Sequence, residues 1–323
     1  MKMTTTNKPI IENKGMQMLL LALVLAMAFL FALTPYSNDA FGSPFDTNDT
    51  AISKVNVTND YPNVRNIRFY TNISAVDIDL YPGTTTRVFC NATIDDANGY
   101  LDINSTNATI FHEFNSSTTL DNQSSHYTNS SCALVGGTGT TYESSCSFDV
   151  WYFAANGTWT CNVTARDQTI SGSYLIATNT SIRNISKLVA LNVTEVIDFG
   201  TLSVGQNSTG DFIANVTNLG NVRLDLNLHG YARNDGDQYA MVCEVGNISI
   251  GWEKYNLTTA GLNHGQMTNI SGAVVGYTEP NVNLIRAQTD VAPSIQNTFW
   301  KIGIPAGLRG QCNGTVVFNA IDG

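Results

Sequence analysis

Apolar and polar residues alternate along most of this chain, from about residue 64 to its end. Around Cys161, the residues Val163 and Ala165 continue one face, whereas Asn162 and Thr164 continue the other. A period of two residues is that of a half-buried β-strand, whose side chains point in turn to the core and to solvent. No segment beyond residue 63 has the apolar spacing of a helix. The pattern predicts an all-β fold.

A chain of 323 residues is long enough for two domains of ordinary size. Turn-forming Gly, Asn and Asp pairs divide the alternating pattern into many short strands, which favours antiparallel sandwiches. We predict a β-sandwich at 64–181 and a second β-sandwich at 182–323. Strands of the second are expected at Lys187–Thr194, Phe212–Val216, Arg223–Leu228, Tyr239–Val245, Ile248–Trp252, Phe299–Ile304 and Gly314–Ala320.

The chain before the first sandwich divides into three parts. Residues 1–15 carry several lysines, residues 16–33 form an almost unbroken apolar run, and residues 34–63 are a polar, stalk-like segment. We expect 16–33 to form a signal or anchor helix that contacts the membrane, with 1–15 in the cytoplasm and everything after Pro35 exported. The mature protein is then extracellular, either secreted or anchored at the cell surface.

Three processing routes remain open for this segment. Small residues near Ala40 would allow cleavage by signal peptidase, and retention would leave an N-terminal anchor. Lys14-Gly15 directly before the apolar run resembles the prepilin-peptidase site of archaeal type IV pilins, although Leu20 stands where many pilins carry Glu. This resemblance implies cleavage after Gly15 and a helix that packs into a filament core.

The triplet Asn-x-Ser/Thr occurs twenty times, against roughly seven expected from composition. Many of the triplets have an apolar middle residue, so a strand that buries this residue presents the Asn and the Thr to solvent. We therefore predict N-linked glycans on an exported domain. The acceptors are Asn48, Asn56, Asn72, Asn91, Asn104, Asn107, Asn115, Asn122, Asn129, Asn156, Asn162, Asn179, Asn184, Asn192, Asn207, Asn215, Asn247, Asn256, Asn269 and Asn313.

All six cysteines follow the apolar segment, and an even number in an exported region indicates disulfides. Six cysteines allow fifteen pairings. The strand pattern narrows them, because it points Cys90 and Cys161 into the same sandwich. We expect Cys132 and Cys146 to close the turn between them, and Cys243 and Cys312 to join strands of the second domain.

The separation and setting of Cys90 and Cys161 resemble strands B and F of an immunoglobulin-like domain. Asn156-Gly157-Thr158-Trp159-Thr160-Cys161 is similar to the Gly-x-Tyr-x-Cys of that family, with Trp159 at the position of the corner tyrosine. Farther on, Ile197–Gln206 and Asn215–Asn221 resemble the Ig-like domains of archaeal and bacterial surface proteins. These resemblances imply two tandem Ig-like sandwiches in a surface glycoprotein, S-layer-like or pilin-like, with an archaeal envelope as its setting.

Charge and motifs restrict the chemistry. The net charge is −10, the pI is about 4.7 and charged residues make up 13% of the chain, so no basic surface is predicted for nucleic acid. We found no nucleophile with its base, no paired carboxylates and no phosphate loop, and we predict no enzyme, no catalytic residue and no cofactor besides glycans. The best metal candidate is a calcium site at Asp95, Asp96, Asn98 and Asp102, although these residues are also typical of a turn.

These features predict a non-enzymatic, glycosylated structural protein of a cell surface, in a coat or an appendage. Its expected partners are the membrane, other copies of itself or other surface proteins. One alternative is a filament subunit, assembled through its apolar helix or by adding the stalk around Val55-Asn56-Val57 to the sheet of a neighbour. Another alternative is an adhesin or carbohydrate-binding module, which would need an exposed aromatic patch or a calcium site beside a face without glycans.

Overall fold

The structure is a computed structural model that describes residues 50–72, 76–168 and 172–323. Two compact units are distinguished, Met1–Val57 and Thr58–Gly323, and every strand of the described residues lies in the second. The predicted apolar helix at 16–33, the cleavage positions Gly15 and Ala40, and the acceptor Asn48 lie outside the described residues. Within the described ranges, no helix has the length and hydropathy needed to span a bilayer.

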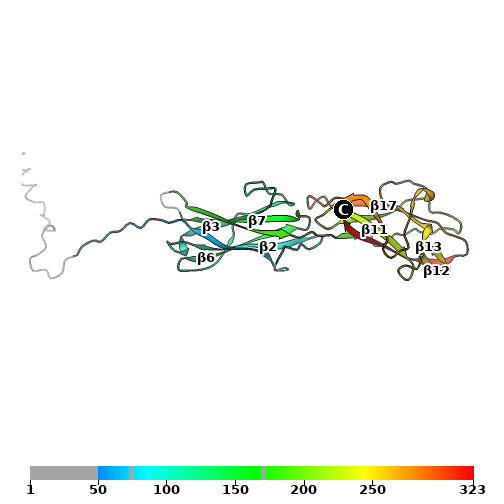
Figure 1. Ribbon diagram of the computed structural model, residues 1–323, viewed down its shortest axis with the longest axis horizontal. Helices are drawn as coiled ribbons and strands as arrows, with labels where there is room; N and C mark the ends of the chain where they lie inside the picture. Colours follow the sequence, from blue (N-terminus) through cyan, green and yellow to red (C-terminus); the bar gives the residue numbers. More distant parts are fainter. Residues whose placement is uncertain (1–49, 73–75, 169–171) are drawn as a thin grey trace, which may run out of the picture. The chain divides into compact units, whose positions relative to one another are not determined.

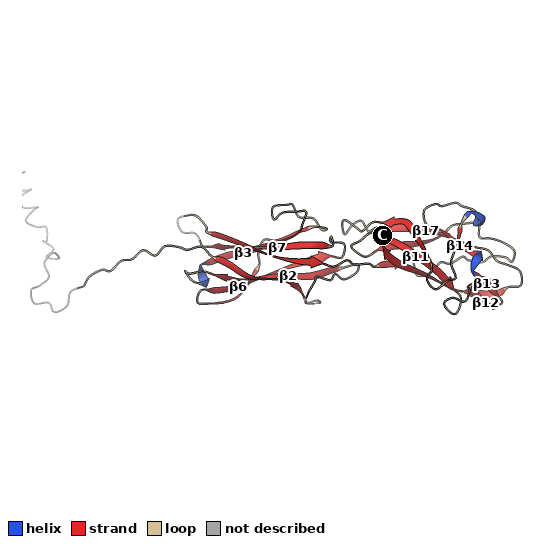
Figure 2. Cartoon of the chain, in the orientation of Figure 1, coloured by secondary structure: helices blue, strands red, loops and turns tan. Residues whose placement is uncertain are grey.

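The described chain is all-β, as predicted, apart from three short 3-10 helices (Figures 1 and 2). The first eight strands are β1 (Asn63–Thr71), β2 (Thr85–Asp95), β3 (Ile103–His112), β4 (His126–Asn129), β5 (Ala133–Thr138), β6 (Thr141–Trp151), β7 (Gly157–Asp167) and β8 (Ile176–Ile185). The 3-10 helix η1 (Tyr100–Asp102) lies between β2 and β3. Every pairing between these strands is antiparallel.

These eight strands form two four-stranded sheets, ordered β1-β2-β6-β5 and β4-β3-β7-β8. Figure 1 shows β3 and β7 in one layer and β2 and β6 in the other. Alternate residues of each strand are buried, and β7, for example, has its inward series at Trp159, Cys161, Val163 and Ala165. The inner faces of both sheets supply one continuous apolar core. This is the two-layer packing that alternation at period two requires.

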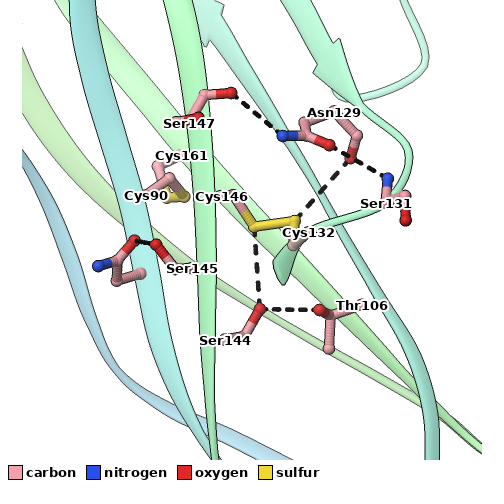
Figure 3. Close-up of a disulfide and its surroundings, with 11 residues drawn as sticks. Cys90, Thr106, Asn129, Ser131, Cys132, Ser144, Ser145, Cys146, Ser147 and Cys161 are labelled. Carbon is pink, nitrogen blue, oxygen red and sulfur yellow. Dashed lines mark hydrogen bonds between the residues drawn. A yellow bond between two sulfur atoms is a disulfide. The ribbon is translucent and has the colours of Figure 1, made fainter. Parts of the chain in front are cut away.

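Two disulfides hold this sandwich together. Cys90 on β2 is bonded to Cys161 on β7, and therefore joins the two sheets through the core. Cys146 on β6 is bonded to Cys132, directly before β5, so this second bridge joins neighbouring strands of one sheet (Figure 3). Both pairings agree with the sequence prediction, which pointed Cys90 and Cys161 into the same sandwich and expected Cys132 and Cys146 to close the turn between them.

Trp159 anchors the entry into β7. Its side chain is fully buried, and its indole Nε1–H donates a hydrogen bond of 2.7 Å to the backbone oxygen of Ala155. In immunoglobulin-like domains the corner tyrosine, two residues before the second cysteine, bonds back to the backbone a few residues upstream. Trp159 stands two residues before Cys161, and its ring nitrogen bonds to the backbone four residues upstream.

The later strands are β9 (Leu191–Val193), β10 (Phe212–Asn218), β11 (Leu224–Tyr231), β12 (Tyr239–Val245), β13 (Asn247–Ser249), β14 (Glu253–Asn256), β15 (Thr268–Asn269), β16 (Tyr277–Leu284), β17 (Ile295–Ile302), β18 (Arg309–Asn313) and β19 (Thr315–Asp322). The 3-10 helices η2 (Ile250–Trp252) and η3 (His264–Gln266) accompany them. They form antiparallel sheets ordered β15-β14-β17-β10-β9, β16-β11-β19 and β13-β12-β18.

A second hydrophobic core lies among these sheets, with Trp300, Tyr255 and Leu226 among its fully buried side chains. Cys243 on β12 and Cys312 on β18 occupy directly opposite register positions and are bonded to each other. This bridge therefore pins the register of an adjacent strand pair.

Several element boundaries differ from the sequence prediction. β8 continues to Ile185, past the predicted domain boundary at 181, because its residues pair with β7 as far as Gly157. The compact unit begins at Thr58, inside the segment predicted as a stalk. In the second half, β14, β15, β16 and β18 were not predicted, and Ile250–Trp252 forms a 3-10 helix rather than the end of a strand.

Candidate functional site

Most of the acceptor asparagines on strands lie on the outward face, but Asn129 and Asn179, on the edge strands β4 and β8, stand opposite the buried Ala108 and Val163 and so lie on the inner face. Of those in the described residues, none is buried. Asn56, Asn72, Asn104, Asn122, Asn179, Asn184, Asn192, Asn207, Asn215, Asn247, Asn269 and Asn313 are exposed, and Asn91, Asn107, Asn115, Asn129, Asn156, Asn162 and Asn256 are half-buried. The strand period places the middle residues inward instead: Ala92, Ala108, Val163 and Val216 are fully or almost fully buried. Attachment of glycans at these positions remains a prediction.

One sheet face is a ladder of acceptor residues. On β3 and β7, Asn107 lies directly opposite Thr164, and Thr109 lies directly opposite Asn162. On β8, Thr180 lies opposite Asn162. Directly opposite side chains in an antiparallel pair are about 5 Å apart at Cβ. Along these rungs the outer face carries short amide and hydroxyl groups that lie too close together for a bulky group on every rung, whereas Ile176 and Ile182 of β8 are exposed on the same face.

Some acceptor side chains are already used by the fold. A sugar would be attached to the Nδ2 atom of each asparagine, and in four of them this atom already donates a hydrogen bond. The donor and acceptor pairs are Asn91 to Tyr70, Asn115 to Ser125, Asn129 to Ser147 and Asn179 to Val64. The bond from Asn129 to the backbone of Ser147 is visible in Figure 3. Bulky modification at such positions would compete with tertiary hydrogen bonds.

The predicted calcium residues do not act as one group. Asp95 accepts hydrogen bonds from the guanidinium of Arg65, with Nη2 at 2.7 Å, and from the Thr141 hydroxyl at 3.0 Å. The Arg65 hydrogen bond is the main reason that the pKa of Asp95 is lowered. Asp95 is therefore neutralised by a protein cation. In the described part of the chain, no three His, Cys, Asp or Glu side chains group closely enough to hold a metal by themselves.

Asp96 and Asp102 behave differently from Asp95. Asp96 is 1% exposed, and one of its oxygens, Oδ2, is buried without a hydrogen-bond donor. Oδ2 of Asp102 is likewise buried without a hydrogen-bond donor. Desolvation is the largest cause of the raised pKa of both carboxyl groups. Asp96 and Asp102 therefore belong to a group of carboxyl groups with no cation beside them, called the acidic cluster below. The prediction named both of these residues, and it wrongly grouped Asp95 with them.

Sequence reasoning missed two members of this cluster. Asp167 is fully buried at the end of β7, and Asn59 donates a 2.6 Å hydrogen bond from Nδ2 to its carboxylate. A signal for Asp167 was present, since it continues the inward series Val163, Ala165 of its strand. No local signal marks Asn59.

A groove opens beside β19 in the second half of the chain. Its volume is about 440 Å³, and it lies between the segment that follows β9 and the first half of β19. Apolar side chains of Ile197, Phe199, Val316 and Phe318 line it, together with the carboxylate of Glu253. Burial raises the pKa of Glu253 to about 8. No ion pair of the described residues involves this carboxylate.

The aromatic side chains that could have formed a sugar-stacking face are mostly core. Tyr152, Phe153, Trp159, Tyr255 and Trp300 are buried, and Trp252, at 40% exposure, lies against the ring of His264. These rings therefore do not form a sugar-stacking face, although Tyr61, Tyr81 and Phe114 are exposed elsewhere on the chain.

Comparisons with known proteins place few limits on function. No protein-family model matches the chain, and a search of curated proteins found no match. Among solved structures, the chain is similar to one from work described as "Chaperone-tip adhesin complex is vital for synergistic activation of CFA/I fimbriae biogenesis", with a TM-score of 0.32, 11% identity and 80% of each chain covered. It is also similar to one described as "BspA_C_WT", with a TM-score of 0.23, 11% identity, and 82% of this chain and 96% of that chain covered. Scores this low carry no argument about function.

Proposed function

We propose that this chain is a non-enzymatic, exported structural protein of a cell surface, coated with N-linked glycans. The observation that carries the proposal is that every described acceptor asparagine lies outside the cores while all six cysteines are paired. Disulfides persist in oxidising extracellular surroundings. With charged residues at only 13%, attached sugars would supply the solubility that charge supplies on most surfaces.

We also propose that the first sandwich is immunoglobulin-like. Its sheets correspond to strand orders A-B-E-D and C′-C-F-G if β1 to β8 are lettered A, B, C, C′, D, E, F and G. On this lettering the Cys90–Cys161 bridge joins strands B and F, and Trp159 takes the corner position. An archaeal envelope is the setting that the sequence resemblance of Ile197–Gln206 favours.

Intact-mass analysis of the protein from its native cells, before and after deglycosylation, tests the glycoprotein proposal. We expect several glycans, concentrated on exposed acceptors such as Asn192, Asn247 and Asn313, and fewer on Asn91 and Asn129, whose Nδ2 atoms are hydrogen-bonded. Glycopeptide mapping checks the positions. A native mass equal to that of the bare polypeptide, with the protein found inside the cell, would refute the proposal.

A filament subunit is the second candidate function, and the edge of β19 favours it. In the first sandwich, β7 is followed by the edge strand β8. In the sheet β16-β11-β19, β19 is itself the edge strand, because no strand of the described residues pairs with its other side. The outer edge of β19 is therefore unpaired. Its sequence from Thr315 to Ile321 carries no charge, so it lacks the charged residues that usually protect an edge.

A strand from another copy could occupy this edge. The segment before β1 has no secondary structure from Ala51 to Val57, and its apolar side chains Val55 and Val57 are 84% and 78% exposed. Spaced two apart, they would point into the groove together while Asn56, an acceptor, pointed out. In this arrangement the segment of one copy adds to β19 of the next copy and repeats head to tail.

Assembly of the full chain provides the test. We expect Val55→Asp combined with Val57→Asp to abolish polymers seen by electron microscopy and light scattering, because charged groups would have to enter the apolar groove. The thermal unfolding of the subunit should be unchanged, since both side chains are exposed. Val291→Asp, at a position 84% exposed, is the matched control and should assemble normally. Polymers of normal length from the double variant would exclude this route.

A further inference from the structure

Three buried oxygen atoms at one end of the first sandwich have no hydrogen-bond donor. They are Oδ1 of Asn59, Oδ2 of Asp96 and Oδ2 of Asp102. Buried polar atoms are almost always paired, and an unpaired carboxylate oxygen is the costliest of them to leave alone. The position of these oxygens therefore indicates a partner that the polypeptide does not supply.

Hydrogen bonds draw the surrounding segments together. The other oxygen of Asp96, Oδ1, accepts the backbone N–H of Asn98 at 2.8 Å. The Asn98 side chain in turn accepts from the N–H of Asp60 at 2.7 Å and donates to the Thr58 oxygen at 3.1 Å. The segment that carries Asn59 is thus held against the turn that carries Asp96.

Asp167 orients the amide of Asn59. Its two oxygens are occupied, Oδ2 by Nδ2 of Asn59 at 2.6 Å and Oδ1 by the N–H of Leu175 at 2.7 Å. Because the Nδ2 donor must face this carboxylate, Oδ1 of Asn59 is turned away from it. Asp102 is tied to the same strand end, since its backbone oxygen accepts the N–H of Gln168 at 2.6 Å.

The charges of this cluster are all negative. Asp96 is within electrostatic range of Asp60, Asp102 and Asp167, and each raises its pKa in addition to the larger effect of desolvation. No described Lys, Arg or His forms an ion pair with Asp96, Asp102 or Asp167. An excess of buried negative charge with oxygen ligands only is the environment of a hard cation.

We propose that Asn59, Asp96 and Asp102 bind one calcium ion through these three oxygens. Asp167 does not touch the ion; it holds the amide of Asn59 in place, as carboxylates that orient metal ligands commonly do. Two carboxylates and an amide, completed by water or backbone oxygens, suit the variable coordination of calcium, whereas magnesium demands near-ideal octahedral geometry and zinc prefers His and Cys. The ion ties the segment before β1 to the turn between β2 and β3, and so stiffens the entry into the sandwich.

Calcium titration of the full-length protein, first stripped with EGTA, tests this proposal. Calorimetry should show one site per chain, with a Kd of about 10⁻⁴ to 10⁻³ M, as in other extracellular modules. At saturating calcium the Tm should rise by about 5 °C, and equal magnesium should give a much smaller rise. A calorimetric trace without binding heat, or equal shifts from both ions, would overturn the proposal.

Two variants separate ion binding from a purely structural role. Asp96→Asn should lose the calcium response but melt no lower than the wild type in EGTA, because a neutral amide replaces a buried charge. Asp95→Asn breaks the ion pair with Arg65 next to the site and should keep the full calcium response. The proposal is wrong if Asp96→Asn still responds to calcium or if Asp95→Asn does not.

Discussion

Replacing both Cys90 and Cys161 with alanine will destabilise the first sandwich by about 4.4 kcal/mol. The two residues are 71 apart in sequence, so reduction of this link frees a long loop in the unfolded chain. Both side chains are fully buried, and their removal also leaves unfilled volume in the core. Since the total stability of a domain is about 5 to 15 kcal/mol, the variant should be partly unfolded at physiological temperature.

Guanidinium unfolding followed by tryptophan fluorescence measures this loss, because Trp151 and Trp159 report on the first sandwich. The control is the double alanine variant of Cys132 and Cys146, which are 14 apart and should cost about 3 kcal/mol. A smaller loss from removal of the Cys90–Cys161 bridge than from the control would contradict the view that the inter-sheet link is the main covalent restraint.

The second large effect concerns the pH dependence of stability and the carboxyl group of Glu253. Its pKa is about 8 in the folded protein because of desolvation, against 4.5 for a Glu side chain fully exposed to water. Between these pH values the native state keeps a proton that the unfolded state has lost, so the free energy of unfolding decreases as the pH rises. The decrease should total about 4 to 5 kcal/mol between pH 4.5 and 8 and then level off.

Glu253→Gln should remove this contribution, since the amide does not titrate. The variant should gain stability over the wild type progressively above pH 5, and the gain should be largest at pH 8 and above. Denaturant unfolding at a series of pH values measures the difference between the two proteins, in which the other titrating groups cancel. Glu195→Gln, on the exposed rim of the same groove, is the control and should leave the curve unchanged. Parallel curves for Glu253→Gln and the wild type would show that Glu253 is not desolvated.

The strands that were missed have a physical explanation. In β14, Glu253 and Tyr255 point inward while Lys254 and Asn256 point outward. A charged residue on the inner face hides the alternation that identifies a strand. β18, with Arg309, Gly310 and Gln311, has no apolar series at all, and it forms because Cys312 is held opposite Cys243. Pairing with neighbouring strands therefore stabilises both β14 and β18, and their own sequences do not predict them.

The acidic cluster also could not be predicted in full from the sequence. Asp96 and Asp102 are close in sequence and were named from it, together with Asp95. Only the structure separates them, because Arg65, on β1, pairs with Asp95 across the sheet and leaves the other two without a cation. Asn59 and Asp167 meet from positions 108 residues apart. No local pattern predicts a meeting of that kind.

The sequence by itself determined which side of each regular strand is buried, and with it most of the outward asparagines and the inward Cys90 and Cys161, because side-chain direction in a strand depends only on position. The tertiary structure alone decided the strand orders, the unpaired edge of β19 and the gathering of Asn59 with Asp96 and Asp102. Sheet order and register depend on the packing of the whole chain, and residues far apart in sequence acquire their neighbours only from that packing.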